Sequence, residues 1–128
     1  MAILQEELAV KEYLCSQGYY EIQTIAMCAK NEFDMFLIPQ DAAERNVVEL
    51  LNPITENLSI MRTLMAPSMV KVIENNIKNG NEAMRFFELA NVYLPKALPL
   101  TEPPVEKKIL CLRQKFLHLC LLWVFHLL

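Results

Sequence analysis

The chain has 128 residues, of which 12 are basic and 15 are acidic, and its formal net charge is −3. A chain of this length is expected to form one domain with a substantial core. A slightly acidic chain whose basic residues are scattered among acids offers no strong field for a phosphate backbone. The composition therefore argues against a dedicated nucleic-acid-binding surface.

Glycine is scarce, with Gly18 and Gly80 as its two occurrences. Loops that cradle phosphates need several closely spaced glycines, so that backbone N–H groups can approach the ligand. The sequence therefore excludes a P-loop and a dinucleotide-binding fingerprint.

The cysteines lie far apart in the chain, at Cys15, Cys28, Cys111 and Cys120. Their spacing fits neither a zinc site nor a small disulfide scaffold, so we expect free thiols in a reducing compartment. The opening residues MAILQEELAV lack the positive flank and apolar run of a signal peptide. A cytoplasmic location is the expectation.

The first part of the chain predicts a helix followed by a strand. Residues 3–17 combine a broad apolar face with interspersed charges, and Gly18 stands where a helix often ends. Residues 19–27 alternate in a period of two and are rich in strand-forming side chains. We therefore expect a helix over 3–17 and a strand over 19–27.

The next segment predicts a short helix and a second strand. Residues 30–38 are a helix candidate that Pro39 closes. Residues 45–53 are predicted to form a strand that ends at Pro53, because proline cannot donate to a ladder.

A second long helix is predicted to begin near Ala66. Pro67 is tolerated in a first turn, Gly80 closes the end, and Thr63 is a candidate cap. Four apolar residues fall on one helical face: Met69, Val70, Ile73 and Ile77.

Residues 83–112 predict two more strands. Residues 83–95 are apolar on both faces, which is typical of a strand inside a sheet. Residues 96–107 hold three prolines and predict an irregular connection before another strand at 107–112. The pattern favours an α+β fold, a mostly antiparallel sheet flanked by helices.

The end of the chain, residues 113–128, differs from the rest because it has no acid, glycine or proline. Its apolar run is shorter than the ~20 residues that a membrane-spanning helix needs. We expect a core module over 1–112 and an atypical apolar tail over 113–128, with an out-of-frame origin as a hypothesis. A small tail-anchored adaptor remains an alternative.

Arg62 is the charged residue that stands out, between the apolar pair Ile60–Met61 and the start of a predicted helix. Its planar fork of donors could join loop carbonyls or a carboxylate. This structural role is favoured over substrate binding. The sequence offers no catalytic, cofactor-binding or metal-ligating constellation.

Three stretches carry a family resemblance: LAVKEYLCSQGYYEIQT, LLNPITENLSIMRTLMAPSMV and NGNEAMRFFELANVYLP. Together they resemble the class II synthetase-like core module of bacterial phenylalanyl-tRNA synthetase β subunits, over about Leu4 to Leu112. The most specific features, in order, are Asn52-Pro53, Met61-Arg62-Thr63, Pro67 and Phe87-Glu88-Leu89.

The resemblance implies a non-catalytic copy of the class II fold. In that family the α subunit activates phenylalanine with ATP and magnesium, and the β copy packs against it. Catalytic copies carry a phosphate-gripping Arg and a Glu after the long strand, where this chain has Leu94 and Lys96. Leucine cannot make a charge-assisted bond to a phosphate oxygen.

The resemblance therefore predicts a structural and assembly module. The chain looks like a fragment of a longer β subunit. We expect it to meet tRNA only as part of the complete enzyme. The partners implied are the α subunit, the rest of the β subunit and, through an open sheet edge, a second copy. Interface candidates lie on the first helix and in residues 52–79: Leu4, Leu8, Arg62, Met65 and Met69. A stand-alone adenylate-forming remnant is the enzymatic alternative.

Overall fold

A computed structural model describes residues 2–81, 83–116 and 119–127. Its helices are α1 (Ala2–Ser16), α2 (Glu32–Met35) and α3 (Ala66–Lys78), with 3₁₀ turns at Ala43–Arg45 and Glu56–Leu58. Its strands are β1 (Tyr20–Glu21), β2 (Met27–Cys28), β3 (Ile60–Met61), β4 (Arg85–Leu94), β5 (Val105–Phe116) and β6 (Leu119–Leu127). The expected α+β class is confirmed.

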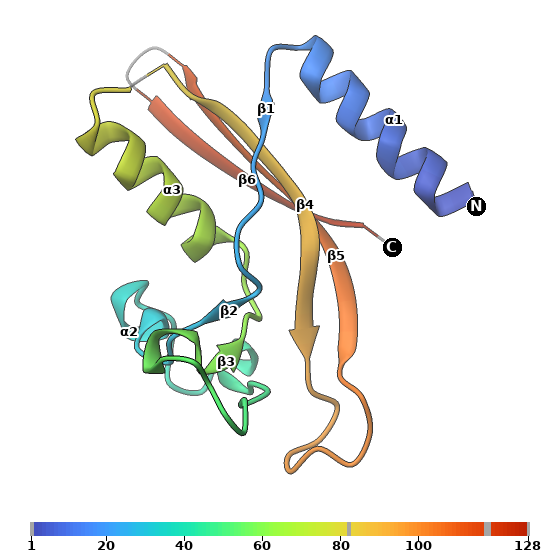
Figure 1. The fold of residues 1–128 in the computed structure, drawn as a ribbon, viewed down its shortest axis with the longest axis vertical. Helices are drawn as coiled ribbons and strands as arrows, with labels where there is room; N and C mark the ends of the chain where they lie inside the picture. The colour runs from blue at the N-terminus through green and yellow to red at the C-terminus, as the bar shows by residue number, and fades with distance from the viewer. Residues whose placement is uncertain (1, 82, 117–118, 128) are drawn as a thin grey trace.

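The main sheet has the order β1-β4-β5-β6 (Figure 1). β4, β5 and β6 are joined by antiparallel ladders, and the short β1 runs parallel to β4. β4 thus lies between two neighbours, as predicted from its two apolar faces. β2 and β3 form a separate antiparallel pair.

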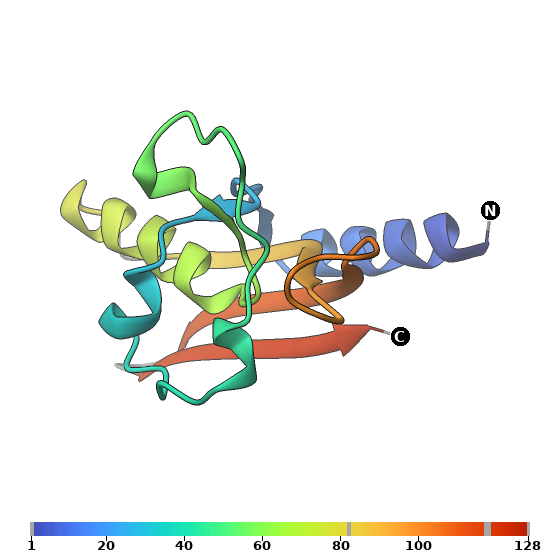
Figure 2. The same cartoon turned by 90° about the horizontal axis from the view of Figure 1, so that it is seen from below.

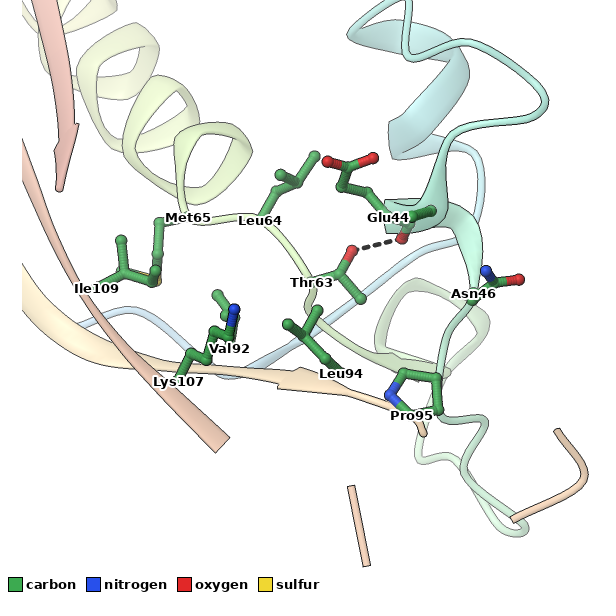
Figure 3. Close-up of a pocket in the computed structure, with 11 residues that line it drawn as sticks. Glu44, Asn46, Thr63, Leu64, Met65, Val92, Leu94, Pro95, Lys107 and Ile109 are labelled. Carbon is green, nitrogen blue, oxygen red and sulfur yellow. Dashed lines mark hydrogen bonds between the residues drawn. The ribbon is translucent and has the colours of Figure 1, made fainter. Parts of the chain in front are cut away.

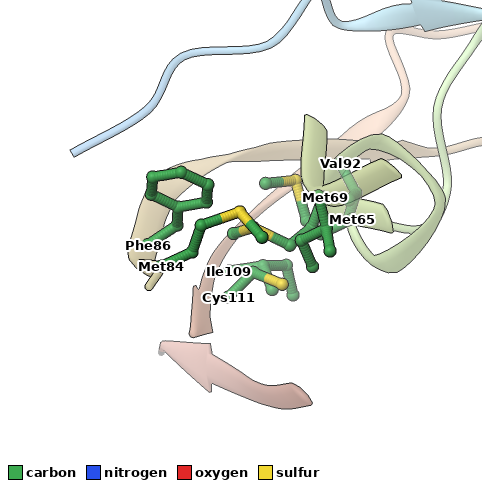
Figure 4. Close-up of a cluster of buried hydrophobic side chains, with 8 residues drawn as sticks. Met65, Met69, Met84, Phe86, Val92, Ile109 and Cys111 are labelled. Atoms are coloured by element: carbon green, nitrogen blue, oxygen red, sulfur yellow. The ribbon is translucent and has the colours of Figure 1, made fainter. Parts of the chain in front are cut away.

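A helix packs on each face of the sheet, α3 on the left and α1 on the right in Figure 1. Successive strand side chains point to opposite faces, so Phe86 and Phe87 of β4 join different cores. Figure 4 shows the core beneath α3, built from Met65, Met69, Met84, Phe86, Val92, Ile109 and Cys111 with Ile73. The core beneath α1 contains Leu14, Phe87 and Leu110.

The predicted helix ends are confirmed, while one predicted cap is wrong. Gly18 and Gly80 follow α1 and α3 with φ of 84° and 78°, a conformation that glycine adopts without strain. Pro67 lies in the first turn of α3. Thr63 does not cap this helix, because its hydroxyl donates to the Glu44 carbonyl and Met65 occupies the cap position.

The strand predicted over 45–53 is wrong. This segment starts in a 3₁₀ turn and continues as extended chain, with a single isolated bridge from Glu49 to Ile60. Among the described residues, the strand that it meets, β3, is two residues long, and Leu51 is 97% exposed. Val47 joins a small core with Cys28, Phe33 and Ile60, and the Leu50 N–H still donates to the Ser59 carbonyl. The pairing does not continue along the exposed residues from Leu51 onward.

The strand predicted over 19–27 is divided into β1 and β2. Between them the Thr24 backbone N–H donates to the Glu88 carboxylate at 2.7 Å. A side chain thus satisfies a donor that a ladder would otherwise use, and the sheet pairing ends early.

The final strand is longer than predicted, because β5 extends from Val105 to Phe116 rather than over 107–112. The apolar tail contributes β6, which pairs with β5 along its whole length. Within the described residues, no helix combines the length and apolar character needed to cross a membrane.

Candidate functional site

A buried polar network centres on Arg62, which is 3% exposed. Its Nε donates to the Asn91 carbonyl at 3.0 Å, and its Nη1 donates to the Thr24 hydroxyl at 2.7 Å. The nearest Arg62 and Glu88 side-chain atoms, Nη1 and Oε1, are 3.8 Å apart. The guanidinium therefore joins a carbonyl and, through Thr24, a carboxylate.

Thr24 completes the network by holding Glu88, which is 2% exposed. Its hydroxyl lies 2.9 Å from both Glu88 carboxylate oxygens, and its backbone N–H donates to one of them. A buried carboxylate is costly unless it is paired and hydrogen-bonded. Here an opposite charge, a hydroxyl and a backbone donor all stabilise it.

The backbone of Arg62 also hydrogen-bonds to the 24–26 segment and to β4. Its N–H donates to the Ala26 carbonyl, and its carbonyl accepts from the Tyr93 N–H, both at 2.9 Å. Arg62 thus connects the chain before α3 to the 24–26 segment and to β4. The structural role predicted for Arg62 is confirmed by these contacts.

A pocket of about 380 Å³ lies beside this network, between the start of α3, the 3₁₀ turn at Ala43–Arg45 and the β4–β5 hairpin (Figure 3). Leu94 lines it, at the position where the family resemblance leads us to expect an arginine in catalytic copies, and Lys107 is the one cation among the lining residues. Lys96 lies in the following loop, where it pairs with Glu102 at 2.8 Å.

The five interface candidates divide into two groups. Leu4 and Leu8 are 75% and 56% exposed on α1, whose N-terminal half extends away from the sheet (Figure 2). Met65, Met69 and Arg62 are buried inside this chain. A partner could not contact those three side chains without opening the core beneath α3.

Known proteins match this chain in sequence and in fold. The family model for the phenylalanyl-tRNA synthetase β-chain CLM domain matches residues 3–113. The chain belongs to this family. The phenylalanine–tRNA ligase β subunit of Clostridium acetobutylicum is 36% identical over 93 residues, which cover 73% of this chain and 12% of that protein.

Further relatives of the CLM domain support the same assignment. The phenylalanine–tRNA ligase β subunit of Syntrophus aciditrophicus is 29% identical over 110 residues, covering 86% of this chain and 13% of that protein. The chain therefore spans only about an eighth of the relatives it matches. Pyrrolysyl-tRNA synthetase from Desulfitobacterium hafniense shares the fold, with a TM-score of 0.67 at 20% identity over 88% of this chain and 38% of that one.

In this CLM domain, the sequence reasoning found Arg62 but missed its partners. In the sequence, Glu88 stands out only as part of Phe87-Glu88-Leu89, and Thr24 lies unmarked within the alternating residues 19–27. The available signal was a carboxylate inside the apolar run RFFELANVYL. A charge there requires a buried partner, and Arg62 also lies in an apolar setting.

Two thiols of the domain are buried in its cores. Burial, reinforced by the nearby Glu32 carboxylate, raises the pKa of Cys28 to about 11. Burial, reinforced by Glu88, raises the pKa of Cys111 to about 12. Cys15, Cys28 and Cys111 are free, as expected, and the prediction for Cys120 lies outside the described side chains.

Replacing Arg62 with alanine is expected to lower the free energy of unfolding by about 3–5 kcal/mol, because Glu88 would stay buried without its cation. Thr24→Val is a milder test, with an expected loss of about 1–3 kcal/mol from the missing hydroxyl. Urea denaturation followed by circular dichroism measures both changes.

The matched control for Arg62 is Arg85→Ala, which removes an exposed arginine whose contact is one bond to the Gln17 carbonyl. Its expected effect is within about 0.5 kcal/mol. Equal losses for the Arg62 and Arg85 variants, or an additive loss when Arg62 and Glu88 are both replaced, would contradict the network.

The raised thiol pKa values predict selective alkylation at pH 8. Cys28 and Cys111 stay protonated there, since the pH lies well below the pKa of each, and a protonated thiol is a poor nucleophile. Iodoacetamide should modify the exposed Cys15 in the native protein and reach Cys28 and Cys111 only in guanidinium chloride. Peptide mass mapping checks each position, and rapid native labelling of Cys111 would refute the assignment.

Proposed function

We propose that this chain is a non-catalytic assembly module of a phenylalanine–tRNA ligase β subunit. The observation that carries the proposal is the absence of a guanidinium among the residues that line the pocket, where Leu94 replaces the arginine of catalytic copies. Arg62, the nearby candidate, donates from Nε to Asn91 and from Nη1 to Thr24, beside Glu88. Such a pocket cannot grip a phosphate by a bidentate bond.

The proposed partner is the α subunit, which would activate phenylalanine with ATP and magnesium in the cytoplasm. The rest of the β subunit would flank this module, and tRNA would be contacted only within the complete enzyme. The module itself holds no cofactor in this proposal.

The N-terminal half of α1 is the proposed contact surface for the α subunit. Ile3, Leu4 and Leu8 are all more than half exposed there, whereas Val10 and Leu14, further along, pack on the sheet. A helix with apolar side chains on two sides is typical of one that packs between two partners. In residues 52–79, Ile54 and Ile77 are the exposed apolar candidates.

The enzymatic alternative is tested with phenylalanine-dependent exchange between ATP and pyrophosphate. The assembly proposal expects no exchange above background from the purified chain. A phenylalanine-dependent signal would instead favour the adenylate-forming remnant.

Leu4→Asp combined with Leu8→Asp, in the intact β subunit and numbered as here, is expected to weaken association with the α subunit more than about tenfold. The reason is that two leucines that would be buried in the contact would be replaced by charges. Co-expression and quantitative co-purification measure the effect. These positions are sharper probes than Arg62 or Met69, whose replacement would disturb the core.

The control for this pair is Leu37→Asp, because Leu37 is 88% exposed just after α2, and α2 lies across the molecule from α1 in Figure 1. It should leave association unchanged. Unchanged association in the α1 variant would contradict the proposed surface.

An open sheet edge is a second proposed contact, between two copies of this chain. β6 is paired with β5, and it is the last strand of the order β1-β4-β5-β6 among the described residues. Its nine residues include no Asp, Glu, Lys, Arg or proline, the residues that commonly discourage edge pairing. Antiparallel pairing of two β6 strands would satisfy both edges.

Light scattering after size exclusion is expected to give a mass that rises toward a dimer with concentration. Hydrogen exchange should show amide protection in β6 rising with the mass, while protection in α1 stays constant. A monomer at every concentration, or protection that rises only in α1, would refute edge pairing.

A further inference from the structure

The pocket described above has a preformed apolar floor. Met65, Val92 and Ile109 line it, and all three also belong to the core beneath α3. Met65 and Val92 are each 2% exposed, so the floor is held by the packing of the whole domain. Its volume of about 380 Å³ lies at the small end of the range for ligand-binding pockets.

Lys107 gives this pocket a cation that forms no ion pair among residues 2–81 and 83–114. Over the same residues, the other lysines all form ion pairs: Lys11, Lys30, Lys71, Lys78, Lys96 and Lys108. Lys107 forms none within the same range. Its ammonium group is therefore available to an external anion.

The register of the sheet directs Lys107 into the pocket. Lys107 is the cross-strand partner of Val92, and cross-strand partners share a face of the sheet. Figure 3 shows its side chain extending along Val92 toward the middle of the pocket. Lys108, one residue on, belongs to the opposite face, where it pairs with Glu7 of α1 at 2.7 Å.

The remaining polar groups lie at the mouth of the pocket. Glu44 and Asn46 line it from the 3₁₀-turn side, and the Glu44 carboxylate lies toward Leu64 in Figure 3, away from the Lys107 ammonium. Thr63 is occupied with the Glu44 carbonyl. One cation above an apolar floor suits a single negative charge attached to a hydrophobic body.

We propose that this pocket binds a small monocarboxylate with an aromatic or branched apolar body. The carboxylate pairs with the Lys107 ammonium, and the body lies on Met65, Val92, Leu94 and Ile109. A polyphosphate does not suit the pocket, because one lysine in a lining that also holds the Glu44 carboxylate cannot balance several negative charges. The binding site is separate from the contact surface proposed on α1, since it lies on the other face of the sheet.

The test is a titration of the isotope-labelled 128-residue chain with 3-phenylpropanoate, followed by ¹H–¹⁵N correlation spectra. Saturable shifts are expected at the amides of Leu64, Met65, Leu94 and Ile109. Lys107→Gln should raise the Kd about fivefold, which is the upper range for an exposed charge pair. The cation 3-phenylpropylamine should bind more weakly than the carboxylate.

Lys108→Gln is the matched control, because it removes the same charge one residue away on the other face. It should leave the Kd unchanged. The proposal is overturned if the shifts do not saturate, if they fall outside the pocket, or if both lysine variants bind alike. Equal affinity for 3-phenylpropylamine and 3-phenylpropanoate would show that Lys107 does not recognise the carboxylate, and would also overturn the proposal.

Discussion

The fold depends on one buried charge pair, Arg62 and Glu88, joined by Thr24. Three segments that are far apart in the chain meet there: the crossing between β1 and β2, the chain before α3, and β4. Taking two charges out of water costs more than their attraction returns unless every polar atom is bonded. The network therefore selects one arrangement of these segments, because any shift would leave a buried charge without its partners.

In the assembly proposal, the same network sets this domain apart from a phosphate-binding site. An arginine fork grips phosphate only when its donors are free, and the Arg62 donors are directed at Asn91 and Thr24. At the end of β4 the corresponding position is Leu94, which contributes apolar surface to the pocket. In that proposal the domain keeps the class II fold without a free arginine for a phosphate: Arg62 serves the fold, and Leu94 carries no charge.

Sequence patterns predicted the elements that have strong periodicity and the positions that need special backbone angles. α1, α3 and β4 follow from their apolar spacing, and Gly18 and Gly80 end the helices as expected. The failed strand over 45–53 has suitable residues but no neighbour long enough to pair with it, which is a tertiary property. The pairing of Arg62 with Glu88 was likewise hidden, because it joins residues 26 positions apart through a threonine on a third segment.

The alternation along β5 explains how one small domain can present two independent surfaces. Lys107 and Lys108 are adjacent in the chain, yet one belongs to the face with the pocket and the other holds Glu7 of α1. Each substitution therefore perturbs one face, because the strand itself separates them. A contact made through α1 and a ligand held over Val92 need not compete. Only a disturbance of the buried Arg62–Glu88 pair, which positions β4 beneath both helices, should affect the two together.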